Sequence, residues 1–299
     1  VPGTISIRKS HRSKASGDGN PTGISTERNA AIARPGRDSA RTTRHAMPNP
    51  FTLRDRLSAV TFDCWQTLLV ERDPAPAVAL RGDALAKAAR QTGRALSRRG
   101  AEEILDAGWR RLDRLWRAGQ SAGSAEMARW ALESLGIESR EVESLQAELA
   151  TSLCDASLAS DIGALDGAVD TLDMLARAGV PCALVCDTGY TPGRVVRQLL
   201  KRADLLRGLG VQVFSNEVGV PKPATAIFDA ALEALGADAH SSIHVGDLKR
   251  TDVAGARARG MSTVRIRQTH DDPARLPEAD VVVDSHADLR AVLADVLPA

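Results

Sequence analysis

The sequence predicts an α/β protein with a doubly wound parallel sheet and a helical domain inserted after the first strand. From Gly167 onward, short apolar runs alternate with segments of helical periodicity, which is typical of a parallel sheet. Between residues 75 and 160, apolar residues recur at helical spacing, with Gly and Ser between the periodic stretches. We therefore assign the α/β body to residues 51–71 and 161–299, and the helical domain to residues 72–160.

The first strand ends in the stretch "VTFDCWQTLL", which begins at Val60. Its β-branched and aromatic residues stop at Asp63, so this strand would carry a carboxylate to the sheet edge where open α/β sheets place their active sites. An Asp in this position can equally cap the following turn. The stretch alone leaves both interpretations open.

The later elements follow in order along the chain. The helical domain contains four amphipathic stretches, at residues 79–96, 97–119, 124–136 and 139–158. The strands of the body are expected at 182–187, 211–215, 242–247, 262–266 and 280–284. Helices are expected at 167–178, from about 192, at 224–235, at 252–259 and at the C-terminal end.

Composition narrows the possible partners. The chain has 299 residues, of which 43% are hydrophobic, and no apolar run is long enough to cross a bilayer. Residues 1–46 carry nine Lys or Arg against three acids, which leaves the rest with 30 basic and 35 acidic residues. This mildly acidic body with few aromatic residues predicts neither nucleic acid nor membrane as a partner. We expect a small-molecule substrate and a monomer or homodimer.

The N-terminal segment and the cysteines bear on cellular context. Residues 1–50 are rich in Ser, Arg, Gly and Thr and lack hydrophobic periodicity, which predicts a disordered basic extension. A nucleic-acid-binding arm, a transit peptide, or a physiological start at Met47 are the alternatives. Cys64, Cys154, Cys182 and Cys186 show no metal-binding spacing, which favours reduced thiols in the cytoplasm.

Three later stretches place polar residues at predicted strand ends. "VCDTG" sets Cys186, Asp187, Thr188 and Gly189 before a helix whose free N–H groups could hold an anion, unless Asp187 or Thr188 caps that helix. In "VPKPA", two prolines restrict the backbone around Lys222, which is unusual for a solvated surface lysine.

The third stretch, "VGDLKRTD", contains Asp247 and Asp252. One interpretation is that these residues only stabilise a turn and cap the following helix. Together with Asp63, they also suit a hard cation such as Mg²⁺.

Taken together, these stretches resemble the four motifs of the haloacid dehalogenase (HAD) superfamily over about residues 59–297. "FDCWQTLL" resembles the first motif, "VCDTG" the second, "SNEVGVPKPATAIF" the third and "VGDLKRTD" the fourth. The helical domain resembles the C1 cap of the dehalogenase/phosphatase branch, which closes over the active site. The resemblance implies a Mg²⁺-dependent phosphatase that acts on a small phosphorylated metabolite.

The resemblance also implies roles for individual residues. Asp63 would attack phosphorus to form an aspartyl-phosphate, with Lys222 offsetting the developing charge. Asp63, Asp247 and the backbone carbonyl of Trp65 would hold the metal, and Asp252 would bind it directly or through water. Residues at the family's phosphate-binding positions are Thr67, Cys186, Asp187, Thr188 and Gly189.

Two departures from the motifs raise rival interpretations. Most family phosphatases carry a second Asp, an acid/base, where this chain has Trp65, and a Ser or Thr where it has Cys186. An indole cannot exchange a proton in this way, so a helical-domain acid such as Glu102 or Asp106, or the substrate itself, would have to replace it.

The form Asp-x-aromatic-x-Thr resembles the 2-haloacid dehalogenases, in which Asp attacks carbon without a metal. Such an enzyme needs an arginine for the substrate carboxylate, and the helical domain offers Arg110, Arg111, Arg114 and Arg117. The two acids of the fourth motif argue against this alternative. A third possibility is a pseudoenzyme that binds a phosphorylated ligand without turnover.

Overall fold

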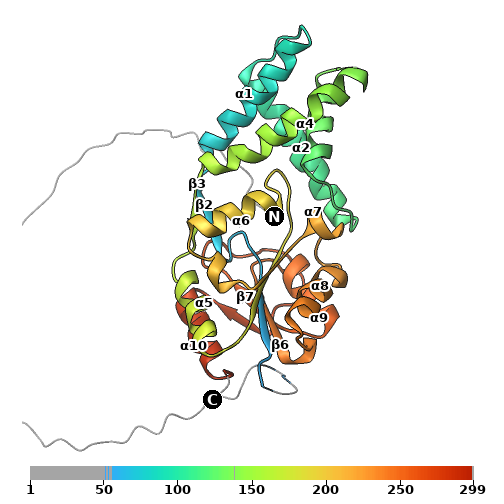
Figure 1. Cartoon of the computed structure of the whole chain (residues 1–299). Helices are drawn as coiled ribbons and strands as arrows, with labels where there is room; N and C mark the ends of the chain where they lie inside the picture. Colours follow the sequence, from blue (N-terminus) through green and yellow to red (C-terminus); the bar gives the residue numbers. More distant parts are fainter. Residues whose placement is uncertain (1–50, 52, 54–55, 138, 298–299) are drawn as a thin grey trace, which may run out of the picture. The chain divides into compact units, whose positions relative to one another are not determined.

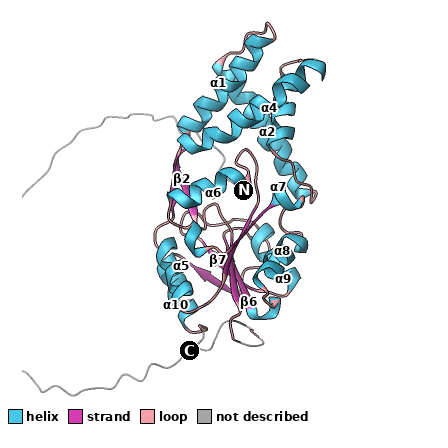
Figure 2. Cartoon of the chain, viewed as in Figure 1, coloured by secondary structure: helices cyan, strands magenta, loops and turns pink. Residues whose placement is uncertain are grey.

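The computed structural model describes residues 51–297 except 52, 54–55 and 138; the predicted extension at residues 1–50 lies outside the described residues. Its central feature is a six-stranded sheet in the order β5-β4-β1-β6-β7-β8. The strands are drawn in magenta in Figure 2. The strands are β1 (Ala59–Phe62), β4 (Cys182–Cys186), β5 (Val211–Phe214), β6 (Ser242–Gly246), β7 (Ser262–Ile266) and β8 (Val281–Val283). Every neighbouring pair is parallel, which confirms the predicted doubly wound sheet.

Helices cover both faces of this sheet (Figure 1). One apolar cluster joins the sheet to α5 (Ala168–Arg177), α6 (Gly193–Arg202) and α10 (His286–Ala294) through residues such as Leu172, Leu199 and Leu289. A separate cluster packs α8 (Thr225–Leu235) and α9 (Ala254–Arg259) on the other face, with Phe228 fully buried. β1, β4 and β6 are buried along their whole length, as expected for central strands of a two-sided sheet.

Four helices between β1 and β4 form a region with its own apolar cluster. They are α1 (Ala75–Gln91), α2 (Arg98–Arg117), α3 (Ser124–Ser134) and α4 (Ser139–Asp155), called here the four-helix segment. Its core includes Leu85, Leu112, Met127 and Leu132, all almost fully buried. The segment therefore packs around a core distinct from that of the sheet.

Two strands that the sequence did not predict join the four-helix segment to the sheet region. β2 (Leu69–Asp73) leads into α1, and β3 (Asp161–Ala164) follows α4; the two pair antiparallel. Helical periodicity had extended to residue 160, where the chain instead forms a short 3-10 turn at Ala156–Ala159 before β3. These strands are short and charged, and their pairing partners are distant in sequence, so local periodicity does not reveal them.

The remaining elements are short. They are the 3-10 turns Leu206–Gly208 and Ala239–Ser241, the helical turn α7 (Ser215–Val218), and a π-helical turn at Lys249–Val253 that precedes α9. Helix 252–259 was predicted two residues too long at its start because this π turn occupies the chain up to Val253. None of the described helices combines the length and apolar composition that crossing a membrane requires.

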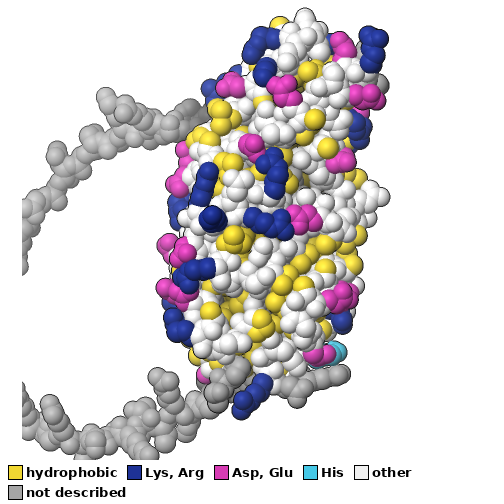
Figure 3. Space-filling model, viewed as in Figure 1, with side chains coloured by type: hydrophobic (Ala, Val, Ile, Leu, Met, Phe, Trp, Pro, Cys, Tyr) yellow, Lys and Arg dark blue, Asp and Glu magenta, His cyan; other side chains and the backbone are white. Residues whose placement is uncertain are grey.

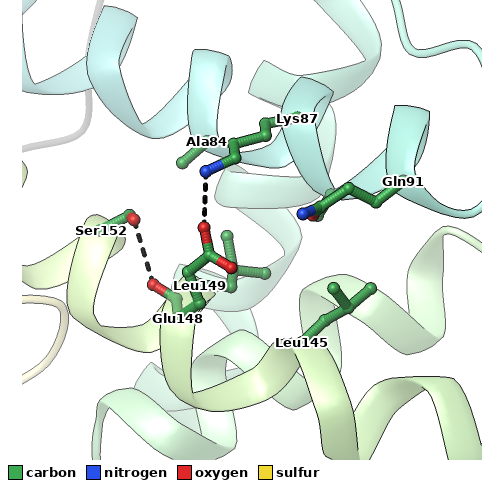
Figure 4. Close-up of a pocket in the computed structure, with 8 residues that line it drawn as sticks. Ala84, Lys87, Gln91, Leu145, Glu148, Leu149 and Ser152 are labelled. Carbon is green, nitrogen blue, oxygen red and sulfur yellow. Dashed lines mark hydrogen bonds and ion pairs between the residues drawn. The ribbon is translucent and has the colours of Figure 1, made fainter.

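A small pocket lies between α1 and α4 of the four-helix segment (Figure 4). Lys87 donates a hydrogen bond of 2.6 Å to Glu148 across it, and both side chains are exposed. The other residues that line it are Ala84, Ala88, Gln91, Leu145, Leu149 and Ser152. This pocket contains none of the residues that the motifs single out, so the candidate site lies elsewhere.

Candidate active site

The motif residues meet at the carboxyl edge of the sheet. β1 lies between β4 and β6, so the residues that follow these three strands, Asp63, Asp187 and Asp247, reach the same edge. Lys222 comes from the loop between α7 and α8. The carboxyl edge of a parallel sheet is where ligands bind in this class of fold.

Lys222 links the first and fourth motifs. Its buried Nζ donates to Asp63 Oδ1 at 2.5 Å and to Asp252 Oδ1 at 2.6 Å. Its backbone N–H donates to Asp187 Oδ1 at 2.9 Å, which fixes the loop that carries the lysine. Burial opposes the charged form, but the neighbouring carboxylates, Asp252 foremost, raise the pKa of Lys222 well above its usual value. The lysine is therefore a permanent positive charge between two acids.

Asp252 has hydrogen-bond partners on both carboxylate oxygens. Oδ1 accepts from Lys222 Nζ and lies 3.3 Å from His244 Nε2. Oδ2 accepts from the Leu248 N–H at 2.9 Å and from Thr251 Oγ1 at 3.2 Å. Although burial opposes ionisation, Lys222 and then His244 lower the pKa of Asp252 below its usual value. Each oxygen already has two partners, so Asp252 serves as the anchor of Lys222.

His244 supports this anchor from inside the sheet. Its Nδ1 lies 2.8 Å from Thr61 Oγ1, and its ring packs edge-to-face on Phe228. Burial lowers the pKa of His244, which keeps the ring neutral. Because Nε2 faces a carboxylate and must carry the proton, Nδ1 accepts from the Thr61 hydroxyl. The sequence motifs gave His244 no role, although a histidine within the apolar strand β6 indicates a buried polar group that needs a partner.

Asp63 and Asp247 are less completely bonded. Burial raises the pKa of Asp63, with Lys222 opposing that rise and Asp252 adding to it. Burial, Asp63 and Asp252 together raise the pKa of Asp247 well above its usual value. Both shifts arise because several carboxylates are crowded in a site of low polarity.

This crowding fits a hard divalent cation. Asp63, Asp247 and Asp252 each offer an oxygen within 4.8 Å of the others. Oxygen donors of this kind suit Mg²⁺, and its charge would relieve the repulsion among them. Because the lone pairs of Asp252 are engaged, Asp63 and Asp247 are the acids best able to bind the ion directly.

The second motif forms the loop between β4 and α6. Asp187 accepts a hydrogen bond from the Lys222 backbone N–H and does not cap α6, which has no side-chain cap among the described residues. Burial raises the pKa of Asp187 to about 7, although the positive charge of Lys222 opposes this rise. The Thr188 N–H donates a hydrogen bond to Ser215 Oγ. The Thr188 hydroxyl donates to Asn216 Oδ1 and accepts from the Asn216 N–H. The first N–H of α6, that of Gly193, also donates to Asn216.

Cys186, the last residue of β4, and Gly189 of this loop are both buried. Burial raises the pKa of Cys186 well above its usual value, so it remains a thiol. A Cβ at Gly189 would lie 2.8 Å from Leu112 and 2.9 Å from Trp109, both on α2. This loop is therefore the place where the four-helix segment packs directly on the site.

Trp65 and Thr67 follow Asp63 in the turn after β1. Trp65 is partly buried and packs against the apolar cluster of the sheet region. The buried Thr67 hydroxyl has no hydrogen-bond partner in the described part of the chain, whereas the Thr67 carbonyl lies 2.8 Å from His286 Nε2. A buried hydroxyl without a partner is the kind of group that a polar ligand would satisfy.

Comparison with known proteins gives a consistent result. The family model for haloacid dehalogenase-like hydrolases matches residues 57–260. Glyceraldehyde 3-phosphate phosphatase of Methanopyrus kandleri is 34% identical over 37% of this chain and 51% of its own length. Ribulose-1,5-bisphosphate 5-phosphatase of Halopiger xanaduensis is 31% identical over 36% of this chain and 44% of its own. The chain thus matches only about half of the length of these curated relatives.

Solved structures agree on the fold. A HAD phosphatase from Thermococcus onnurineus superposes with a TM-score of 0.56 at 23% identity, covering 81% of this chain and all of that one. A 2-haloacid dehalogenase from Pseudomonas syringae gives a TM-score of 0.57 at 23% identity, covering 80% of this chain and 98% of that one. The fold is shared by phosphatases and dehalogenases, so it does not by itself distinguish these reactions.

Proposed function

The chain belongs to the haloacid dehalogenase-like hydrolases, and we propose that it is a Mg²⁺-dependent phosphatase of a small phosphate ester, with Asp63 as the nucleophile. The observation that carries this proposal is the pairing of Lys222 with both Asp63 and Asp252, beside the weakly bonded Asp247. A dehalogenase that works without metal has no need of the additional acids. Their crowding is most simply accounted for by a bound cation.

In this mechanism the Asp63 carboxylate attacks phosphorus, and the bond from phosphorus to the leaving-group oxygen breaks. The resulting aspartyl-phosphate is then hydrolysed by water at phosphorus, which releases phosphate and restores Asp63. Lys222 opposes the rise in the pKa of Asp63 that burial causes, and it offsets negative charge as it develops. Mg²⁺ held by Asp63, Asp247 and the Trp65 carbonyl would supply further positive charge at the phosphate.

Phosphate oxygens would be bound by the loop after β4 and by Thr67. The unpartnered Thr67 hydroxyl is available as a donor. The Thr188 hydroxyl already donates to Asn216, so backbone N–H groups near Gly189 are the better candidates in that loop. The Cys186 thiol is a weak donor, which makes its contribution small.

The four-helix segment would act as the cap that selects the substrate. Tyr190, directly after the phosphate-binding loop, donates from its hydroxyl to the Leu105 carbonyl of α2 at 3.2 Å and packs edge-to-face on Trp109. The segment is therefore in position to contact a substrate bound beside Asp63. The two curated relatives are named for phosphatase activity on glyceraldehyde 3-phosphate and ribulose-1,5-bisphosphate. These names favour a small phosphorylated sugar as the substrate of this protein.

Dehalogenation is the second candidate, and Trp65 is the residue that favours it. Two of the four α2 arginines that could bind the substrate carboxylate already have partners, however. Arg117 pairs with Asp113, and Arg111 stacks over Trp130 at 4.3 Å. Both arginines are thus engaged within the four-helix segment.

A substrate panel with and without Mg²⁺ tests the proposal. We expect the wild-type protein to hydrolyse phosphate esters only with Mg²⁺, and the Asp63→Asn variant to be inactive because an amide is a poor nucleophile. Release of halide from 2-chloropropionate in EDTA would establish the dehalogenase instead. Binding of Mg²⁺ and a phosphate mimic, without turnover of any ester, would indicate a pseudoenzyme.

A further inference from the structure

His270 lies beside the proposed metal site but has no role in the mechanism above. Its Nε2 is 3.4 Å from Asp247 Oδ2. That nitrogen is buried and makes no hydrogen bond within the described residues, although the side chain as a whole is 34% exposed. A buried ring nitrogen directed at a carboxylate and otherwise unpartnered requires an explanation.

The loop that carries His270 is fastened to the turn that carries Asp247. Asp272 accepts a hydrogen bond of 2.8 Å from the Lys249 backbone N–H, two residues after Asp247. Lys249 Nζ donates back to the Ala274 carbonyl at 3.2 Å. The buried Arg265 of β7 pairs with Asp271 at 2.8 Å. Three residues that follow His270, namely Asp271, Asp272 and Ala274, therefore fasten its loop beside Asp247.

The neighbouring threonine places the ring proton. Thr269 Oγ1 lies 3.2 Å from His270 Nδ1. If this hydroxyl donates to Nδ1, the proton of the neutral ring is on Nε2 and points at Asp247. The 3.4 Å contact, which is not a hydrogen bond in this structure, then places a donor beside an acceptor.

We propose that His270 is a positioning residue whose Nε2, 3.4 Å from Asp247 Oδ2 and without a hydrogen bond in this structure, donates to that oxygen once Mg²⁺ is bound and so directs Oδ1 toward the metal. This inference rests on the proposed function, in which Asp247 binds Mg²⁺. Asp252 shows the contrast, because four donors fix its carboxylate, whereas His270 is the side chain that pairs with Asp247 among the described residues. Hydrogen bonds to ligating carboxylates orient them, and their loss typically weakens metal binding about 10- to 100-fold.

Direct ligation by His270 is disfavoured by the geometry. The three acids form a group with ligand atoms all within 4.8 Å, and His270 is not a member of that group. The imidazole therefore acts through Asp247, as an outer partner of the ligand.

The test is the Mg²⁺ affinity of the full-length protein measured by isothermal titration calorimetry. We expect His270→Leu to weaken Mg²⁺ binding about 10- to 100-fold, while kcat at saturating Mg²⁺ changes little. His270→Gln, whose amide can still donate, should retain affinity within a few-fold of wild type. His240→Leu is the matched control, because His240 precedes β6 at the opposite end from Asp247, and its affinity should equal that of wild type.

Thr269→Val provides a milder variant if His270→Leu does not fold. It removes the hydroxyl that fixes the ring proton, so it should weaken Mg²⁺ binding by less but in the same direction. Wild-type affinity in His270→Leu, or in Thr269→Val where His270→Leu does not fold, would overturn the positioning role. Failure of the wild type itself to bind Mg²⁺ would instead overturn the proposed function.

Discussion

Ion pairs at the carboxyl edge of the sheet are buried, whereas those on the four-helix segment are exposed to solvent. At the edge, Lys222 is 2% exposed and lies between two carboxylates. On α2, Arg117 and Asp113 form an i,i+4 pair whose side chains are 53% and 36% exposed. Charges of both signs are likewise interspersed over the visible surface of the molecule (Figure 3).

This difference determines what each charge can do. Removing one partner of a buried ion pair typically costs about 3–5 kcal/mol, whereas an exposed pair contributes about 0–1 kcal/mol. Charges that are buried and hydrogen-bonded therefore fix a geometry, and exposed charges mainly keep the surface polar. The comparison is one reason why the proposed chemistry is assigned to Lys222 and its partners and not to Arg117.

The largest effect is expected from Lys222→Met. This change leaves Asp63 and Asp252 buried without their cation, so the free energy of unfolding should fall by about 3–5 kcal/mol at pH 8. Without the lysine, both carboxylates bind protons more readily in the folded than in the unfolded state, so the deficit should shrink as the pH falls toward 5. Urea unfolding followed by tryptophan fluorescence measures it; equal stability at pH 8 would contradict the assigned role of this pair.

Asn substitutions of the two fourth-motif acids should separate their roles. In EDTA, Asp252→Asn should lower the melting temperature because it weakens the bonds to Lys222 and His244. Asp247→Asn should preserve or raise it at pH 8, because the raised pKa of Asp247 means that its charged form destabilises the fold above that pKa. Asp247→Asn should also abolish the stabilisation by added Mg²⁺. The reverse order of melting temperatures in EDTA would refute this division.

Trp65→Asp probes the aromatic residue that stands two positions after Asp63. If the phosphatase lacks its usual acid/base, an acid here should accelerate hydrolysis of alkyl phosphates by up to about 10²–10⁴-fold. p-Nitrophenyl phosphate should gain less, since nitrophenolate leaves without a proton. Stability must be measured in parallel, because loss of a large side chain can open a cavity. Unchanged rates for both esters in a folded variant would show that the proton is handled elsewhere.

The smallest effect is expected from a substitution in the exposed ion pairs of the four-helix segment. Arg117→Ala removes an exposed pair of the four-helix segment, so the free energy of unfolding should change by less than about 1 kcal/mol and phosphatase activity should be unaffected. A large loss of activity at constant stability would instead indicate that this arginine contacts the substrate.

The sequence predicted most of the fold because the sheet's strands are short apolar runs separated by regular helices. It missed β2 and β3, whose pairing depends on residues far apart in the chain. It predicted that Asp63, Lys222, Asp247 and Asp252 belong to one site, and the structure brings their side chains together. It left open the role of Asp252. That role became clear only from the four donors around its carboxylate.

His244 and His270 show the same limit. Each is a polar residue in or just after a strand, but its role depends on a partner from another segment. His244 reaches Asp252, and His270 reaches Asp247. Spacing within one motif does not show such contacts.

The central claim, that Asp63 forms an aspartyl-phosphate, is tested most directly by acid quenching during turnover. The protein is mixed with Mg²⁺ and the phosphate ester it hydrolyses fastest, quenched at steady state and digested, and the peptide with Asp63 is analysed by mass spectrometry. We predict a phosphoryl group on Asp63 that accumulates, because Trp65 cannot activate the water that removes it. Steady release of phosphate while Asp63 remains unmodified would contradict the account.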